Sequence, residues 1–203
     1  MNNKDSRATR WDHEVIFELI PQDATVLDLG CGNGELLRKL IDHKNISGMG
    51  VERNIERVEG CIGNDVPVYH ADLDRGLPQL PEKFFDFVIL EKTLQAVNSP
   101  LDLLDEMLRL GKAGIISFLN FGYKGVIESF VANERMPITK TLPYNWYNTP
   151  NIHLFTAMDF VDLVRDKDIN IEMGMSWIHG EVKPFKESEA RDAEEILFMI
   201  SRG

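Results

Sequence analysis

Two spacings of hydrophobic residues recur along the 203-residue chain and predict alternating strands and helices. Short apolar runs bounded by turn residues are typical of buried strands, whereas apolar residues three or four positions apart are typical of amphipathic helices. The apolar runs predict strands over residues 24–29, 47–52, 66–71, 84–90, 113–118, 170–177 and 196–201. The helical spacings predict helices over residues 10–20, 35–43, 55–62, 100–110 and 157–166. This alternation predicts an α/β domain.

The first predicted strand runs directly into a glycine-rich turn, Gly30-Cys31-Gly32-Asn33-Gly34, which precedes the helix over 35–43. Glycine permits a sharp turn and lets a ligand approach the backbone, and the N–H groups that begin the helix then face that ligand. With Asp28 the segment reads D-x-G-x-G-x-G and resembles motif I of the class I S-adenosylmethionine (SAM) methyltransferases. The resemblance implies that Asp28 orders the loop and the cofactor's amino group. The alternative is a glycine turn that serves only tight packing of strand against helix.

An acidic residue stands at the end of, or directly after, each of the next three predicted strands. Glu52 ends the second strand, Asp72 follows the third, and Glu91 follows the fourth. Because the cleft of an open α/β sheet lies at the carboxyl ends of its strands, we expect these acids to border one site. A carboxylate in the place of Glu52 suits the two hydroxyls of a ribose, since both of its oxygens are acceptors.

The resemblance to methyltransferases extends this predicted cofactor site. It implies that Asp72 receives the adenine amino group and that Leu73 offers its backbone N–H. Arg53, which follows the ribose acid, belongs to the same predicted site. The alternatives are an exposed acid at a strand end for Glu52 and a turn-forming aspartate for Asp72. An NAD-binding protein is a further interpretation, but the glycine spacing and Asp72 count against it.

The balance of charges narrows the class of partner. Lys and Arg number 22 against 33 Asp and Glu, which gives a net charge of −11. Since nucleic acid binding relies on basic side chains, DNA, RNA and anionic membranes are disfavoured. Methyltransferases that act on DNA or protein amides carry [DN]-P-P-[YF] after the fourth strand, where this chain has Glu91-Lys92-Thr93-Leu94-Gln95. We therefore expect a small molecule or another protein as the partner.

Length and composition predict one globular domain over residues 1–203, with 43% apolar and 27% charged residues. No apolar run approaches the ~20 residues of a membrane span. Residues 1–7 lack the apolar core of a secretion signal, so we expect a cytoplasmic protein. The two cysteines, Cys31 and Cys61, form no C-x-x-C pair or metal-ligand cluster, which predicts reduced thiols and no metal.

Residues 120–156 depart from the alternating pattern because aromatic residues and prolines crowd together there. Such a segment predicts an irregular insertion over the carboxyl edge of the sheet, where loops carry function. Its His153, Tyr144 and Tyr147 are candidates for a catalytic base, as is Glu91. None of them forms a diagnostic pair, and a structural role is the alternative for His153.

The insertion also carries the most specific resemblance in the chain. Several segments together resemble the MetW family of methionine-biosynthesis proteins. These segments are residues 72–77, 93–95, 120–122, 135–140, 142–147 and 149–153. The resemblance runs from about residue 10 to 171 and implies a Rossmann-like class I methyltransferase fold. That fold has a seven-stranded, mostly parallel sheet with an antiparallel C-terminal strand and helices on both faces. The chain departs from the family pattern at Leu119, Arg53 and Glu91-Lys92.

Two hypotheses of function follow. In the first, the protein transfers a methyl group from SAM to a small molecule, and its main task is to hold the acceptor in line and exclude water. In the second, it binds SAM or S-adenosylhomocysteine and acts with, or regulates, a MetX-type homoserine O-acyltransferase, the partner that the family resemblance implies. Aromatic residues and arginine are favoured in interface cores, which fits Tyr144, Trp146, Tyr147 and Arg135. The resemblance favours the second hypothesis and leaves the methyl acceptor and the acyl donor open.

Overall fold

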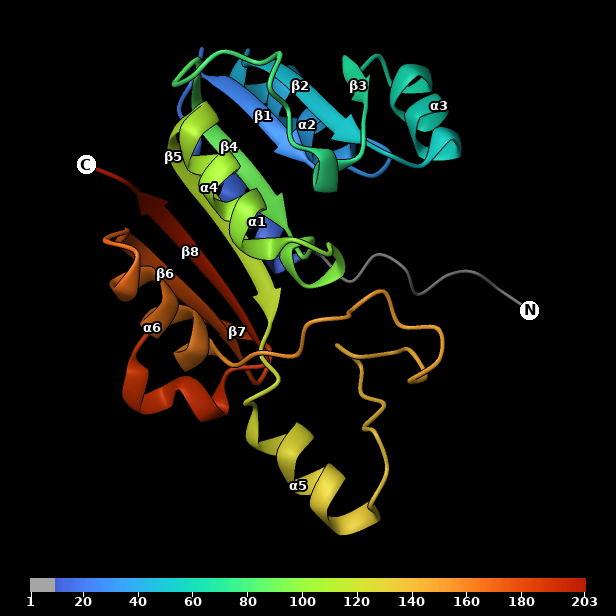
Figure 1. The fold of residues 1–203 in the computed structure, drawn as a ribbon, viewed down its shortest axis with the longest axis vertical. Coiled ribbons are helices and arrows are strands. Elements are labelled where there is room, and N and C mark those ends of the chain that lie inside the picture. Colours follow the sequence, from blue (N-terminus) through green and yellow to red (C-terminus); the bar gives the residue numbers. More distant parts are fainter. Residues whose placement is uncertain (1–9) are drawn as a thin grey trace.

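The computed structural model describes residues 10–203, which form a mixed eight-stranded sheet with helices packed on it (Figure 1). The strands are β1 (Thr25–Leu29), β2 (Ser47–Glu52), β3 (Val68–His70), β4 (Phe85–Glu91), β5 (Gly111–Leu119), β6 (Asn170–Ile178), β7 (Glu181–Pro184) and β8 (Glu195–Ser201). The α-helices are α1 (Trp11–Leu19), α2 (Glu35–Lys44), α3 (Ile55–Gly63), α4 (Pro100–Leu110), α5 (Lys124–Asn133) and α6 (Ala157–Asp166). Three short 3₁₀ helices join them: η1 (Leu73–Arg75), η2 (Leu94–Ala96) and η3 (Glu187–Asp192). Residues 1–9, where the sequence indicates no secretion signal, lie outside the described residues.

The order of strands across the sheet is β3-β2-β1-β4-β5-β8-β6-β7. Strands β1 to β5 pair in parallel, and β8 lies antiparallel between β5 and β6. This arrangement confirms the predicted mostly parallel sheet with an antiparallel C-terminal strand. The structure adds β7, which pairs antiparallel with the end of β6 at the sheet edge. Its residues are mostly exposed, so it has no apolar run that would have predicted an eighth strand.

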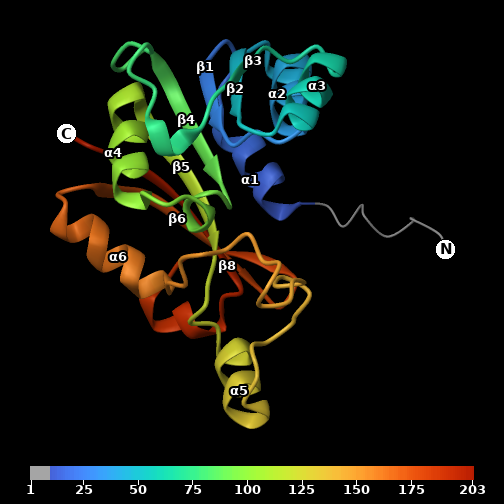
Figure 2. The ribbon, with the colours of Figure 1, turned by 45° about the vertical axis from the view of Figure 1, so that its right-hand side comes forward.

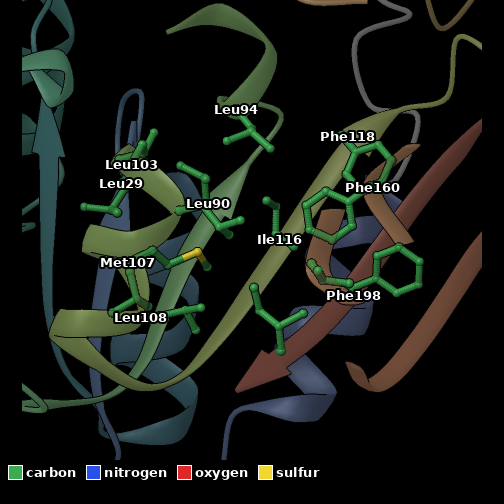
Figure 3. Packing of buried hydrophobic residues seen from close by; sticks show 14 of the residues in the cluster. Leu29, Leu90, Leu94, Leu103, Met107, Leu108, Ile116, Phe118, Phe160 and Phe198 are labelled. Carbon is green, nitrogen blue, oxygen red and sulfur yellow. The ribbon is translucent and has the colours of Figure 1, made fainter. Parts of the chain in front are cut away.

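Successive residues of the central strands point to opposite faces of the sheet and build two separate cores. Leu27 and Ile116 face one core, which α4 and α6 cover, whereas their neighbours Val26 and Ile115 face the other, which α1, α2 and α3 cover. Figure 3 shows the first core, in which Met107 of α4 lies near the leucines of β1 and β4. Burying each side chain of this size stabilises the fold by about 1.5–3 kcal/mol. The two cores hold the carboxyl ends of the parallel strands along one edge of the sheet.

Among residues 10–203, no helix is both long and apolar enough to cross a bilayer.

The segment over residues 120–156 is more regular than predicted. It contains α5, which protrudes from the body of the domain in two views (Figures 1 and 2). The expectation of no regular element was wrong here because the prolines begin only at Pro137, which leaves the preceding residues free to form a helix. Val126 anchors α5 by packing against Leu119 and Leu142. Residues 134–156 form no further helix or strand before α6.

Candidate cofactor-binding site

A cleft of about 630 Å³ opens at the carboxyl ends of the parallel strands. Most residues of the predicted cofactor site line it. They are Asp28, Gly30, Cys31, Gly32, Asn33, Glu52, Arg53, Asp72, Leu73 and Glu91. Gly34 does not line the cleft and instead occupies the N-cap position of α2. The topology thus brings together side chains and loop residues that follow four different strands.

The glycine loop lies so close to Thr93, just after β4, that a side chain at one loop position would collide with it. Gly30 has a φ of +82°, and a Cβ there would lie 2.6 Å from the Thr93 hydroxyl oxygen. At Gly32, with a φ of +59°, a Cβ would meet nothing within 4 Å, so open space covers the backbone. The N–H groups of Gly30 and Cys31 donate to the Val51 carbonyl over 2.8 and 3.2 Å and hold the loop on β2. The loop therefore presents bare backbone to the cleft.

The buried carboxylate of Glu52 orders both the glycine loop and the turn after β2. One oxygen accepts a hydrogen bond from the Gly32 N–H over 3.1 Å. The other oxygen accepts from the N–H groups of Arg53 and Asn54 over 2.9 and 2.8 Å. Hydrogen bonds to an ionised acceptor are the stronger kind. Since a carboxylate has about four acceptor sites, Glu52 keeps capacity for a ligand hydroxyl.

Asp28 is a buried carboxyl with an unused acceptor. Its side chain is 3% exposed, and its Oδ1 has no hydrogen-bond partner within residues 10–203. Burial raises the pKa of Asp28 to about 7, with the Arg10 charge opposing this rise and the Glu52 charge adding to it. Leaving a buried acceptor unpaired costs stability, so a group of this kind beside a cleft indicates a place for a ligand donor.

Asp72 combines the two roles that the sequence left as alternatives. Its carboxylate caps η1 by accepting the Asp74 N–H over 3.2 Å, which is the turn-forming role. Asp72 and Leu73 also line the cleft. Beyond Arg53 and Asp72 an open groove of about 750 Å³ continues toward Arg75.

Charges from α1 form one wall of the cleft, and no local pattern predicted them. Arg10 and His13 both line the cleft and pair with Glu91, His13 through Nε2 over 2.8 Å. Burial, together with the Arg10 charge, lowers the pKa of His13 to about 4, so this ring is neutral at pH 7. Glu91, a candidate base in the sequence, is therefore held by a cation and an imidazole.

A second set of contacts anchors α1 to the sheet. The buried Asp12 lies 3.2 Å from Lys92, whose ammonium also lies 2.7 Å from Glu195. Glu195 accepts the Trp11 indole N–H over 2.8 Å, and Trp11 stacks on Trp177 with ring centroids 5.9 Å apart. Burial alone would raise the pKa of Asp12, but the charges of Lys92 and Arg10 lower it. These contacts join α1 to residues at the ends of β4, β6 and β8.

Three groups of this wall lie close enough together to hold one metal ion: Asp12, His13 and Glu91. Both carboxylates already have a protein cation beside them, because Arg10 contacts each of them and Lys92 contacts Asp12. A divalent ion would have to enter against these two positive charges. The arrangement favours an ion-pair network.

The structure brings one of the three catalytic candidates of the insertion to the cleft. Tyr144 lines it, but His153 and Tyr147 do not. The His153 backbone N–H donates to the Gln95 carbonyl over 3.1 Å, and its Nε2 is buried with no partner within residues 10–203. Tyr147 lies on the surface with its ring against Trp146. The hydrogen-bonded pair of His13 and Glu91 in the cleft comes from α1 and β4, and not from the insertion.

The two cysteines lie behind the glycine loop with their sulfur atoms 3.7 Å apart as free thiols. Burial raises the pKa of both Cys31 and Cys61. The Cys61 thiol donates to the Gly32 carbonyl over 3.1 Å. Because the thiolate is the reactive form, these are packing residues that support the loop.

The sequence matches a known family over most of its length. Residues 10–200 match the family described as "Methionine biosynthesis protein MetW". A relative from Rhodopirellula baltica, "Bifunctional methionine biosynthesis protein MetXA/MetW", is 39% identical over 175 residues, or 82% of this chain. The chain spans 28% of the length of that relative.

Solved structures share the fold at low identity. One is a SAM-dependent methyltransferase from Thermotoga maritima, described as a possible histamine N-methyltransferase, with a TM-score of 0.70 and 19% identity over 95% of this chain and 87% of that one. Another is the [4+2]-cyclase SpnF, with a TM-score of 0.67 and 14% identity over 94% of this chain and 80% of that one. At such identities the likeness shows the fold alone, and the two names describe different reactions.

Proposed function

This chain belongs to the MetW family of methionine biosynthesis proteins, and we propose that it is a SAM-binding subunit that acts with a MetX-type homoserine O-acyltransferase. The observation that carries the proposal is the unpaired, buried carboxyl of Asp28 beside a cleft lined by bare glycine backbone. Buried polar groups in folded proteins normally have partners, so this cleft is incomplete without a ligand that brings a donor.

The chemistry of the cleft residues fits SAM or S-adenosylhomocysteine group by group. Asp28 would accept from the ammonium of the amino-acid end, and Arg10, which pairs with Asp12 and Glu91, lines the same cleft. Glu52 has one free acceptor site, enough for one hydroxyl of a ribose. Asp72 and Leu73 line the side on which the family resemblance puts adenine. When bound, SAM supplies a methyl group for transfer and, as the pathway's end product, a signal of methionine supply.

The relative from Rhodopirellula baltica supports the choice of partner. Its name joins MetXA and MetW in one protein, and this chain aligns with 28% of it. Two activities that are fused in one protein are expected to act together. The acyltransferase is therefore the first partner to test. Its acyl donor, acetyl-CoA or succinyl-CoA, stays open.

An active methyltransferase on a small molecule is the second candidate. Tyr144 favours it, because this phenol of the insertion lines the cleft and can touch an acceptor there. Against it, Arg10 and His13 already hold Glu91, which the sequence offers as a candidate base. Methyl transfer needs a base only where the acceptor loses a proton, so acceptors without an exchangeable proton remain compatible.

Calorimetric titration tests both candidates. SAM is titrated into the pure protein, then into the protein saturated with the acyltransferase, and the same samples are assayed for S-adenosylhomocysteine formation. SAM affinity that changes with the partner, without turnover, supports the proposed subunit. Affinity that ignores the partner, with turnover on an added acceptor, favours the enzyme. Absence of SAM binding would refute the assignment of the cleft.

A further inference from the structure

We propose that one exposed face, built by α5 and the segment after it, is where the acyltransferase subunit docks. This inference rests on the proposed function and adds the location. We call the surface the aromatic face. Its exposed apolar residues are Ile127, Phe130, Val131, Met136, Ile138, Tyr144, Trp146, Tyr147, Ile152 and Leu154.

The aromatic face exposes more apolar surface than a monomer normally leaves in water. Trp146 is 75% exposed, although tryptophan is among the side chains that gain most from burial. Summed over its ten residues, polar atoms included, the exposed area is on the order of 1,000 Å², whereas the largest apolar patch of a typical monomer is about 300–600 Å². A standard protein interface buries about 800 Å² on each partner. The area is therefore that of one protein-protein interface.

Two local structures contain most residues of the aromatic face. Ile127, Phe130 and Val131 follow one another at helical spacing and lie along one side of α5. Beside α5, a shallow groove is lined by Met136, Tyr144, Trp146 and Leu154, among others. Figures 1 and 2 show α5 and residues 134–156 together at the end of the domain away from α3.

Charge distinguishes the aromatic face from the rest of the chain. Residues 121–155 contain three basic and two acidic side chains, whereas the whole chain has a net charge of −11. Depletion of charge with enrichment of aromatic residues is the composition of an interface core. Anionic lipid is recognised by clusters of basic residues, which this segment lacks. A protein surface is therefore the expected partner, and the name of the fused relative favours an acyltransferase as that protein.

The aromatic face is connected to the cofactor cleft through two residues. Tyr144 lines both the cleft and the groove of the face. Gln95, fully buried in η2 between cleft residues, exchanges two hydrogen bonds of 3.0 Å with the Leu119 backbone. The backbone carbonyl of Gln95 accepts hydrogen bonds from the N–H groups of Ile152 and His153 over 2.8 and 3.1 Å. A ligand in the cleft and a partner on the face thus contact one connected structure, so each is expected to change the affinity of the other equally.

Two substitutions on the face and a matched control test the location. Ile138→Asp and Trp146→Ala alter the face, and Ile62→Asp places the same new charge on α3, where Ile62 is 64% exposed against 61% for Ile138. The dissociation constant for the acyltransferase is measured by calorimetry, after circular dichroism has shown that each variant is folded. We expect both face variants to bind the acyltransferase about tenfold or more weakly, and the control to bind like the wild type. SAM affinity of the isolated protein should stay within about twofold in Ile138→Asp.

The outcomes separate the location from the function. If the wild type binds the acyltransferase and the face variants bind it equally well, the face is not the docking site, while the proposed function stands. If the wild type does not bind the acyltransferase, the proposed function fails and this inference fails with it. If Trp146→Ala weakens SAM binding more than acyltransferase binding, the segment is a cofactor lid. If sedimentation shows that Ile138→Asp breaks a dimer of this chain instead, the face pairs two copies.

Discussion

Replacing Asp28 by asparagine should make the free protein more stable and remove its ability to bind SAM. The side chain keeps its shape in this substitution but loses the charge that burial disfavours. Asp28 has an ordinary pKa of 3.8 and a pKa of about 7 in the folded protein. A group of this kind costs folding free energy whenever the solution pH ionises it in the unfolded chain.

The size and the pH window of the effect follow from the two pKa values. Between about pH 4 and pH 7 the folded state holds a proton that the unfolded state has lost, so stability falls as the pH rises. A shift of about three units corresponds to roughly 4 kcal/mol, reached in full above pH 7. At pH 5 the destabilisation caused by Asp28 is less than about 2 kcal/mol. We therefore expect Asp28→Asn to gain up to about 4 kcal/mol at pH 8 and clearly less at pH 5.

Urea unfolding at pH 5 and pH 8 measures this difference directly. The exposed Asp166 provides the control, since Asp166→Asn removes a carboxylate that is already in water. Calorimetry on the same samples should show that Asp28→Asn no longer binds SAM. The reasoning is refuted if Asp28→Asn is destabilised equally at both pH values, or if it binds SAM as tightly as the wild type.

Three further predictions follow from the same site. SAM affinity should fall about tenfold for each pH unit below 7, because protonated Asp28 cannot pair with the ligand ammonium; calorimetry from pH 5.5 to 8 measures this slope, and a flat profile would contradict it. Gly30→Ala should lower the free energy of unfolding by about 1–3 kcal/mol in thermal unfolding, because of its positive φ and the facing Thr93 hydroxyl. Gly63→Ala, with open space around the added Cβ, should cost nothing, and equal effects of the two substitutions would contradict the steric cause. Lys92→Met should cost about 3–5 kcal/mol in urea unfolding, because the buried Glu195 loses its cation and the buried Asp12 keeps only Arg10. Lys112→Met, in an exposed pair, should cost less than about 1 kcal/mol; similar losses would show that the network contributes little.

The elements that could be predicted are those whose cause is local. Strand β2 and helices α4 and α6 have the predicted bounds, because apolar spacing, Pro100 at the start of α4 and the Thr156 capping box all act within a few residues. Strand β7 escaped prediction because an edge strand needs little apolar sequence when its neighbour supplies the hydrogen bonds. Helix α5 escaped because the aromatic composition of the whole segment hid a proline-free helical stretch.

The candidate site divides in the same way. The acids at the strand ends could be predicted to converge because strand direction alone puts them at one edge. The hydrogen bond of Glu52 with the Gly32 N–H could not be predicted, since that bond depends on how the glycine loop folds back over β2. The wall of the cleft joins Arg10 and His13, which precede β1, to Glu91 at the end of β4. Lys92 and Glu195, which also pair, lie even farther apart in the sequence. Nothing in the local spacing of hydrophobic residues encodes such pairs.

The site and the surface together favour a binding subunit over an independent enzyme. The features that hold a ligand are present in detail: bare loop backbone at Gly32, an ordered Glu52 and an unpaired Asp28. Glu91, the acid that the sequence offers as a candidate base, is instead engaged in anchoring α1. A protein that only transferred methyl groups would have no need to keep an apolar face the size of an interface in water, because such exposure promotes aggregation. A protein that reports ligand occupancy to a partner needs both features and a connection between them, and Gln95 and Tyr144 join the cleft to the aromatic face.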